Sequence, residues 1–149
     1  MRFMIVLAAI LLSAAACTAP DFTLSRIDGT TVSLSELRTR PVLVDFGATW
    51  CPSCRLDYPH LSRVYEQRAD MGVEMLVVSI AEDRAIVERF IRSSGVSFNF
   101  VLDEGTVAQQ YRVVSLPTKY FIDGSGAVRQ VQAGPMSYEA MVAGLEAIR

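Results

Sequence analysis

The feature that most constrains the fold is a pair of cysteines that directly follows an apolar stretch. Residues 42–54 read VLVDFGATWCPSC, in which apolar and β-branched residues give way to small residues, one aromatic residue and then Cys51-Pro52-Ser53-Cys54. This order predicts a buried strand, a short loop and the first turn of a helix. Cysteines so spaced at a helix start can form a disulfide, and the helix dipole and open N–H groups there stabilise a thiolate. We therefore expect reversible thiol–disulfide exchange.

The composition favours one globular domain and excludes several partners. The chain has 149 residues, 51% of them hydrophobic, and a formal net charge of −2. This length is ample for a core without disulfide staples, and three cysteines do not make a disulfide framework. Because there is no basic excess and no Lys/Arg-rich run, we expect no nucleic-acid partner.

The N-terminus is typical of an export signal. Arg2 precedes the apolar run 3–16, which is shorter than a membrane span and fits the core of a signal peptide. Ala14-Ala15-Ala16 fits a general secretory cleavage site. Together with Cys17 it also resembles a bacterial lipoprotein signal, in which Cys17 becomes the acylated N-terminus. We interpret 1–19 as signal peptide, of the lipoprotein type, and tether, and 20–149 as the domain. Either cleavage predicts a periplasmic or other extracytoplasmic protein, and acylation would anchor it to a membrane.

Periodicity and turn residues predict alternating strands and helices after the tether. Apolar runs favour strands, stripes at helical spacing favour helices, and Gly, Pro and Asp clusters separate them. We expect strands at 22–26, 31–33, 42–46, 73–80, 98–102, 119–123 and 127–132, and helices at 52–69, 83–94, 104–111 and from 137 onward, with a single helical turn after Ser33. This order implies an α/β sandwich with a mixed sheet.

Three motifs make the chain resemble the thioredoxin fold, and within it the TlpA/ResA-like thiol–disulfide oxidoreductases. They are Trp50-Cys51-Pro52-Ser53-Cys54 after a strand, Ser115-Leu116-Pro117-Thr118 before one, and the span 73–90 with Glu82-Asp83. The resemblance covers roughly 21–149. It implies a three-layer sandwich with a mixed central sheet, helices on both faces and a short N-terminal β-hairpin extension.

The resemblance assigns catalytic roles to four residues. Cys51, at the helix start, is expected to attack a substrate disulfide, and Cys54, one turn further in, to resolve the mixed disulfide. Pro117 matches the family's cis-proline. Asp45 matches the buried Asp of thioredoxins, where a raised pKa would let it accept the Cys54 proton; the alternative is a solvated Asp at a strand edge.

Six further residues are predicted to line a substrate groove: Trp50, Pro52, Ser53, Leu116, Asp57 and Glu82. The backbone of Leu116 could pair with an extended substrate. Asp57 stands where the ResA-like branch usually carries Glu, so its reach toward the thiols is open. Its alternative role is a first-turn acid favoured by the helix dipole. Glu82 is expected at an acidic rim.

The function expected from the resemblance is an extracytoplasmic reductant of protein disulfides, for example those of cytochrome c maturation. Its partners would be protein dithiols or disulfides and a membrane redox partner that recycles it, and we expect a monomer without cofactor or metal. A zinc site would need two more ligands than the pair provides, with only Cys17 and His60 left to supply them. The alternative function is a copper-site assembly factor of the Sco type, although that role wants a wider cysteine pair and a distant His. A peroxiredoxin-type peroxidase would need Thr or Ser where Ala48 stands.

Overall fold

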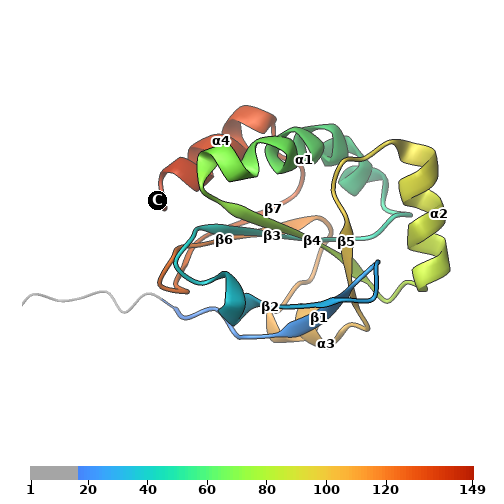
Figure 1. Ribbon diagram of the computed structural model, residues 1–149, viewed down its shortest axis with the longest axis horizontal. Coiled ribbons are helices and arrows are strands. Elements are labelled where there is room, and N and C mark those ends of the chain that lie inside the picture. Colours follow the sequence, from blue (N-terminus) through green and yellow to red (C-terminus); the bar gives the residue numbers. More distant parts are fainter. Residues whose placement is uncertain (1–16) are drawn as a thin grey trace, which may run out of the picture.

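The computed structural model describes residues 17–149, and their strands form one mixed seven-stranded sheet (Figure 1). The strand order is β2-β1-β5-β4-β3-β6-β7. The strands are β1 (Thr23–Arg26), β2 (Thr31–Ser33), β3 (Val42–Gly47), β4 (Glu74–Ile80), β5 (Phe100–Asp103), β6 (Thr118–Ile122) and β7 (Val128–Ala133). The helices are η1 (Leu34–Leu37, a 3-10 turn), α1 (Pro52–Met71), α2 (Arg84–Ser94), α3 (Thr106–Gln110) and α4 (Tyr138–Glu146). The predicted elements are thus all present, in the predicted order.

Strand β3 lies inside the sheet, between β4 and β6, and leads directly to the cysteine pair. It pairs in parallel with β4 and antiparallel with β6. All six of its residues are buried, as are the middle five of β4. Strands covered on both faces read as nearly continuous apolar runs, which explains why these two could be located from sequence.

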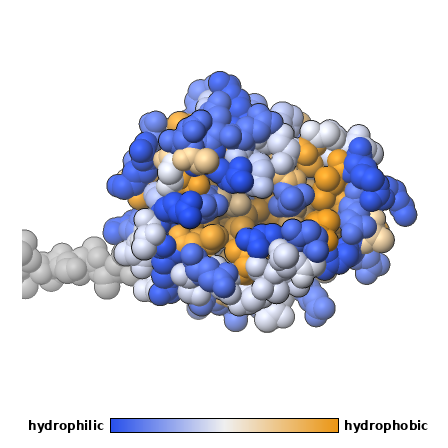
Figure 2. Space-filling view, in the orientation of Figure 1, coloured by the Kyte–Doolittle hydropathy of each residue, from blue (hydrophilic) through white to orange (hydrophobic). Residues whose placement is uncertain are grey.

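Two apolar cores lie on opposite faces of the sheet. Helices α1 and α4 cover one face, while η1 and α3 lie on the other (Figure 1). The first core includes both paired cysteines, and the second contains residues of β1, η1 and α3. The space-filling view is mostly hydrophilic over α1 and α4, as expected of an outer layer (Figure 2). The molecule therefore has the predicted thioredoxin-like three-layer architecture.

The N-terminal hairpin extends the main sheet instead of standing apart from it. Strand β1 pairs antiparallel with β5 at Ser25–Leu102 and Arg26–Val101. The turn after β2 is closed as the sequence suggested, because the Glu36 carboxylate accepts the Ser33 N–H at 3.0 Å.

Helix α2 makes limited contact with the core. It buries only Val87 fully, and Ile86 is exposed. It packs at the margin of the first core through half-buried Phe90 and Ile91. Within residues 17–149, no helix combines the length and the apolar character needed to cross a bilayer.

Residues 17–19, the described end of the predicted tether, are docked on the domain. Val128 donates its N–H to the Cys17 carbonyl at 2.8 Å, Thr18 forms a β-bridge with Ala127, and Ala19 is buried. These backbone bonds add a short antiparallel segment next to the β6–β7 turn. The proposed signal peptide itself lies outside the described residues.

We predict that Gly144→Ala destabilises the domain. A Cβ at Gly144 in α4 would lie 2.5 Å from Cε1 of Phe121 in β6, so helix and sheet would have to separate. We expect the free energy of unfolding to fall by about 1–3 kcal/mol, although alanine favours helices by about 1 kcal/mol over glycine. Urea titration measures this. The exposed neighbour variant Ala143→Ser should stay within about 0.5 kcal/mol of the parent, and a stabilised Gly144→Ala protein would contradict the close packing.

Candidate active site

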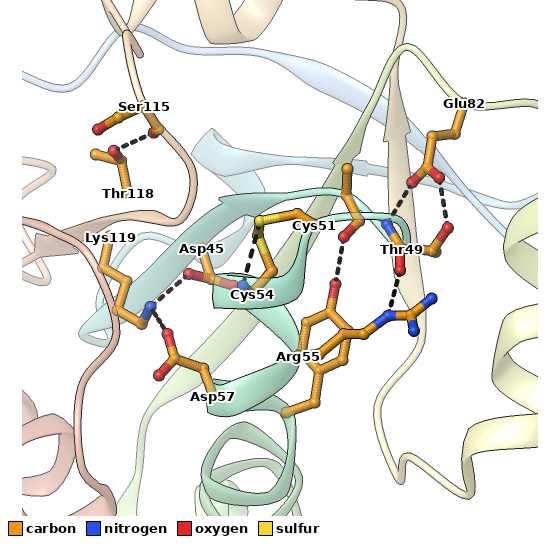
Figure 3. The surroundings of a disulfide bond; sticks show 12 residues. Asp45, Thr49, Cys51, Cys54, Arg55, Asp57, Glu82, Ser115, Thr118 and Lys119 are labelled. Atoms are coloured by element: carbon orange, nitrogen blue, oxygen red, sulfur yellow. Dashed lines mark hydrogen bonds and ion pairs between the residues drawn. A yellow bond between two sulfur atoms is a disulfide. The ribbon is translucent and has the colours of Figure 1, made fainter.

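The cysteine pair forms a disulfide at the mouth of α1. Cys51 is the N-cap of the helix and is joined to Cys54, with their Cα atoms 5.3 Å apart. The Sγ atom of Cys51 also accepts the Cys54 N–H at 3.2 Å (Figure 3). Only 5% of Cys51 is exposed, and Cys54 is fully buried. An attacking reagent therefore meets Cys51 first, and a thiolate there would have the N–H groups of the first helical turn to stabilise it.

The loop before Cys51 is held from both sides. Glu82, which follows β4, accepts the Thr49 N–H at 2.8 Å and also the Thr49 hydroxyl. From α1, Arg55 donates to the Thr49 carbonyl at 2.7 Å, and the Tyr58 hydroxyl donates to the Ala48 carbonyl at 3.0 Å. These bonds fix the backbone that carries the reactive sulfur (Figure 3).

A cis-proline lies beside this loop. The Leu116–Pro117 peptide bond is cis, as the motif predicted. The antiparallel register pairs Phe46 of β3 with Thr118 of β6, so Pro117 follows on next to Gly47. Pro117 is buried, and half-buried Leu116 packs against the core that contains the disulfide. Pairing of β3 and β6 thus brings together two motifs more than sixty residues apart in the sequence.

Gly47 allows the Cys54 sulfur to lie close to the backbone that follows Asp45. A Cβ at this position would lie 3.1 Å from Cys54 Sγ and 4.0 Å from Asp45 Oδ2. The sulfur of Cys54 and the carboxyl of Asp45 therefore both approach Gly47, where a larger residue would crowd the sulfur.

Under the disulfide lies a buried group of three charged side chains. Lys119 is directly opposite Asp45 in the β3–β6 register, and its Nζ is 2.9 Å from Asp45 Oδ1. The same Nζ donates a hydrogen bond to Asp57 Oδ2, and Asp57 Oδ1 accepts the Met136 N–H at 2.8 Å. Figure 3 shows Asp45 between Lys119 and the disulfide. The three side chains are almost completely shielded from solvent.

Burial raises the pKa of Asp45 to about 6. Loss of hydration is the largest cause, the Lys119 ammonium opposes it, and the neighbouring Asp57 carboxylate adds to it. The contact with the Lys119 ammonium is an ion pair at 2.9 Å, and within the described residues neither oxygen of Asp45 accepts a hydrogen bond from any other group. A carboxyl group with this pKa exchanges its proton close to neutral pH. The solvated alternative for Asp45 is therefore wrong.

The predicted groove residues occupy two different kinds of position. Trp50 is 65% exposed, Pro52 is exposed and Ser53 is half-buried, so all three can contact a bound polypeptide. Asp57 cannot line a groove, because it is buried under the helix and paired with Lys119. The Asp57 side chain, which was predicted to line the groove, therefore lies in the interior.

Glu82 also differs from a simple rim residue. Besides Thr49 it accepts a hydrogen bond from the Ser79 hydroxyl at the end of β4. It is half-buried, and its contacts connect β4 to the loop of the cysteine pair. Its role in the structure is to support that loop.

Sequence reasoning missed Lys119, Arg55 and Tyr58 as parts of the site. Lys119 begins a stretch that alternates in character, where a charged residue is expected on the solvent face. Its burial depends on being opposite Asp45, and that pairing follows from a strand register that no local pattern reveals. The available signal was an unpaired Asp in an apolar strand, which calls for a buried cation.

A set of metal ligands is not assembled in the described chain. Within residues 17–149, no three or more His, Cys, Asp or Glu side chains are arranged to hold a metal ion. The single histidine, His60, is half-buried on α1, and the two active-site cysteines are bonded to each other.

Comparisons with known proteins agree with this geometry. The model of the AhpC/TSA family matches residues 15–131. The thiol-disulfide oxidoreductase ResA of Geobacillus kaustophilus (strain HTA426) is 36% identical over 133 residues, which are 89% of this chain and 76% of the relative. A thiol:disulfide interchange protein of the thioredoxin family from Chlorobium tepidum TLS has a TM-score of 0.82 at 25% identity, covering 91% of this chain and 98% of its own. The exposed lipoprotein thioredoxin Etrx1 of Streptococcus pneumoniae strain TIGR4 has a TM-score of 0.78 at 25% identity, covering 86% and 99%.

A disulfide at a helix N-terminus, a cis-proline beside it and a thioredoxin-like sheet define a thiol–disulfide oxidoreductase. The recognised resemblance is confirmed by sequence and structure alike. The chain belongs to the AhpC/TSA family of thioredoxin-fold proteins and is similar over most of its length to ResA.

We predict that Asp45 makes the stability depend on pH in an unusual direction. The native carboxyl keeps its proton up to about pH 6, whereas the unfolded one loses it near its ordinary pKa of 3.8. The native state therefore binds more protons between these values, and the free energy of unfolding falls as pH rises through this window. Asp45→Asn should remove this loss of stability with rising pH. At pH 7.5 the free energy of unfolding of the variant should exceed that of the parent by up to about 3 kcal/mol.

Urea unfolding of parent and variant at pH 4 and pH 7.5 measures this effect, and the gain should shrink toward pH 4. Asp123→Asn is the matched control with the opposite sign. Hydrogen bonds from Ser125, Arg129 and Ala127 hold the pKa of the Asp123 carboxyl at about 2, so this variant should lose stability at pH 7.5. An equal difference between parent and Asp45→Asn at both pH values would rule out the raised pKa.

Proposed function

We propose that this protein is an extracytoplasmic reductant of protein disulfides, with Cys51 as nucleophile and Cys54 as resolving thiol. The observation that carries the proposal is the Cys51–Cys54 disulfide at the N-cap of α1, beside cis-Pro117 and above Asp45. Similarity to ResA supports the reaction class. Preparation of cysteines for cytochrome c maturation is one such role.

The first step begins from the reduced form, in which Cys51 is the accessible thiolate. Its sulfur attacks one sulfur of the substrate disulfide, so a Cys51–substrate disulfide forms and the substrate S–S bond breaks. The electron pair of the broken bond leaves on the other substrate sulfur as a thiolate. The open N–H groups of the first turn of α1 lower the energy of the Cys51 thiolate before the attack.

The second step uses the buried side of the site. Cys54 gives its proton to Asp45, directly or through one water, and the new thiolate attacks Cys51 Sγ. The intramolecular disulfide forms, the bond to the substrate breaks, and the second substrate sulfur leaves with its electron pair. The substrate has then gained two electrons and the protein has lost two. Asp45 suits this step because its raised pKa, about 6, lets it accept a proton and release it again near neutral pH.

The substrate polypeptide is expected to bind in extended form across the loop of the cis-proline. Pro117 has no N–H, so the Leu116 backbone is free to pair with a peptide without competition from the next residue. Exposed Trp50 and Pro52 and half-buried Ser53 supply the opposite rim. These contacts are to backbone and to apolar surface, which suits a range of protein disulfides.

The location and recycling are part of the same proposal. The export signal in 1–16 lies outside the described residues, and exposed Cys17 is the proposed acylation site. The solved relative Etrx1, described as an exposed lipoprotein thioredoxin, supports such an anchor. A membrane redox partner would return two electrons to the Cys51–Cys54 disulfide after each turnover, and the protein would act as a monomer.

We predict different outcomes for the two active-site cysteines. Cys51→Ser should abolish reduction of a protein disulfide such as insulin, because no other exposed sulfur is at the site. Cys54→Ser should instead accumulate a mixed disulfide at Cys51, detected by non-reducing electrophoresis and mass spectrometry. Cys17→Ser is the matched control, since it removes a cysteine outside the site and should retain parental activity. Equal and mild losses in both active-site variants would contradict the assigned roles.

We predict that Cys17→Ala releases the full-length protein from membranes. Without the Cys17 thiol the proposed acylation cannot occur, so after cell fractionation the protein should move from the membrane to the soluble extracytoplasmic fraction. Thr18→Ala, which keeps the acylation site, should remain with the membrane. Tight membrane association of Cys17→Ala, in the presence of salt, would refute the lipid anchor.

A further inference from the structure

A buried lysine lies under the disulfide and has no part in the reaction steps above. Lys119 is fully shielded from solvent in β6, although lysine is among the residues least often buried. Burying an ammonium is costly unless anions surround it. The Lys119 ammonium contacts two carboxylates, those of Asp45 and Asp57, so the reason for its burial is to be found in these two contacts.

The two carboxylates are held very differently. Both oxygens of Asp57 are used, one by the Lys119 ammonium and the other by the Met136 N–H at 2.8 Å. Asp45 has the ion pair with Lys119 at 2.9 Å but no hydrogen bond to either oxygen. Asp57 is therefore the anchor that fixes the ammonium, and Asp45 is the carboxyl that is free to change its protonation state.

Within residues 17–149, the polar and charged side chains found next to Asp45 come from β6 and α1. Strand β6 contributes Lys119, and helix α1 contributes Asp57 together with Cys54 and the Tyr58 hydroxyl. On the β4 side the register partner of Asp45 is apolar Val77. Burial raises the pKa of Tyr58, so this hydroxyl stays neutral. With one cation and two carboxylates, the group carries a net negative charge that disappears when Asp45 takes up a proton.

We propose that Lys119 is a positioning residue of the redox centre: its ammonium, anchored by Asp57, sets the pH at which Asp45 accepts the proton of Cys54. This inference rests on the proposed function of Asp45 in the second step. Attraction from Lys119 favours the Asp45 carboxylate, and repulsion from Asp57 opposes it. The balance holds Asp45 poised between its two states in the pH range where the protein works.

The proposal predicts opposite effects of two changes in one charge group. Lys119→Met keeps a long apolar side chain but removes the cation, so the midpoint of the Asp45 titration should rise by about one pH unit or more. Asp57→Asn removes the repelling anion and leaves Lys119 to Asp45 alone, so the midpoint should fall. The double variant Lys119→Met/Asp57→Asn lacks both the attracting cation and the repelling anion. Because the influence of Lys119 on Asp45 exceeds that of Asp57, the Asp45 midpoint of the double variant should lie above the parent's but below that of Lys119→Met.

Two measurements read the midpoint. The 13Cγ signal of Asp45, followed by NMR against pH in the oxidised protein, reports the protonation of the carboxyl without any turnover. The rate at which Cys54 resolves a mixed disulfide between Cys51 and a small aromatic thiol, measured against pH, reports its use in the reaction. The matched control is Arg40→Met, which removes a cation from the exposed pair with Glu74 and should leave both midpoints unchanged.

Lys119→Met leaves two buried carboxylates without a cation and could fail to fold. The double variant has the same net charge in this group as the parent. Its Asp45 midpoint should lie above the parent's and that of Asp57→Asn below it, so these two variants are enough for the test. Midpoints that stay at the parent value in these two variants, or that move in the same direction, would overturn the role of Lys119. Failure of the proposed function would look different, because Cys51→Ser would then reduce insulin as fast as the parent, whatever the Asp45 midpoints.

Discussion

The site depends on a carboxyl group buried in the middle of β3, an inner strand of the sheet. Asp45 lies in β3 among residues that are all shielded from solvent, and its burial is tolerated because Lys119 lies directly opposite on β6. The pair β3–β6 has to be in this register for the two charges to meet, since a shift by one residue would place them on opposite faces. That same register brings cis-Pro117 beside Gly47, in the loop that leads to the cysteine pair. One strand pairing therefore aligns the proposed proton acceptor, Asp45, with the cis-proline loop.

The reactive sulfur is positioned by a second, independent set of contacts. Cys51 ends the loop that Glu82 holds from the β4 side and that Arg55 and Tyr58 hold from α1. The helix start supplies N–H groups to a thiolate, and the buried charges supply a place for the proton of Cys54. Exposed surface meets the site only near Cys51, so an incoming disulfide has one sulfur to react with first. The polar contacts thus separate a solvent side, where we propose that the substrate binds, from an interior side, where we propose that the proton moves.

Much of this arrangement could be predicted from sequence, because it follows from local patterns. An apolar run before Cys51 located the central strand, and the Ser115–Thr118 motif located the cis-proline. What could not be predicted depended on contacts distant in sequence. Lys119 looks like a surface residue until β6 is paired with β3, and Asp57 looks like a first-turn acid until that lysine reaches it. Docking of Ala19 beside the β6–β7 turn was missed for the same reason, since short backbone pairing at a domain edge leaves no periodicity to read.

The central claim is that transfer of electrons at the disulfide is coupled to a proton on Asp45. The most direct test is the redox potential of the Cys51–Cys54 couple, measured in defined thiol buffers between pH 5 and pH 8, for the parent and for Asp45→Asn. Reduction places negative charge next to Asp45 and should raise its pKa, so the potential of the parent should change slope near pH 6, where the carboxyl of the oxidised form titrates. In Asp45→Asn this change of slope should be absent. Parallel plots for the two proteins across the whole range would contradict the account.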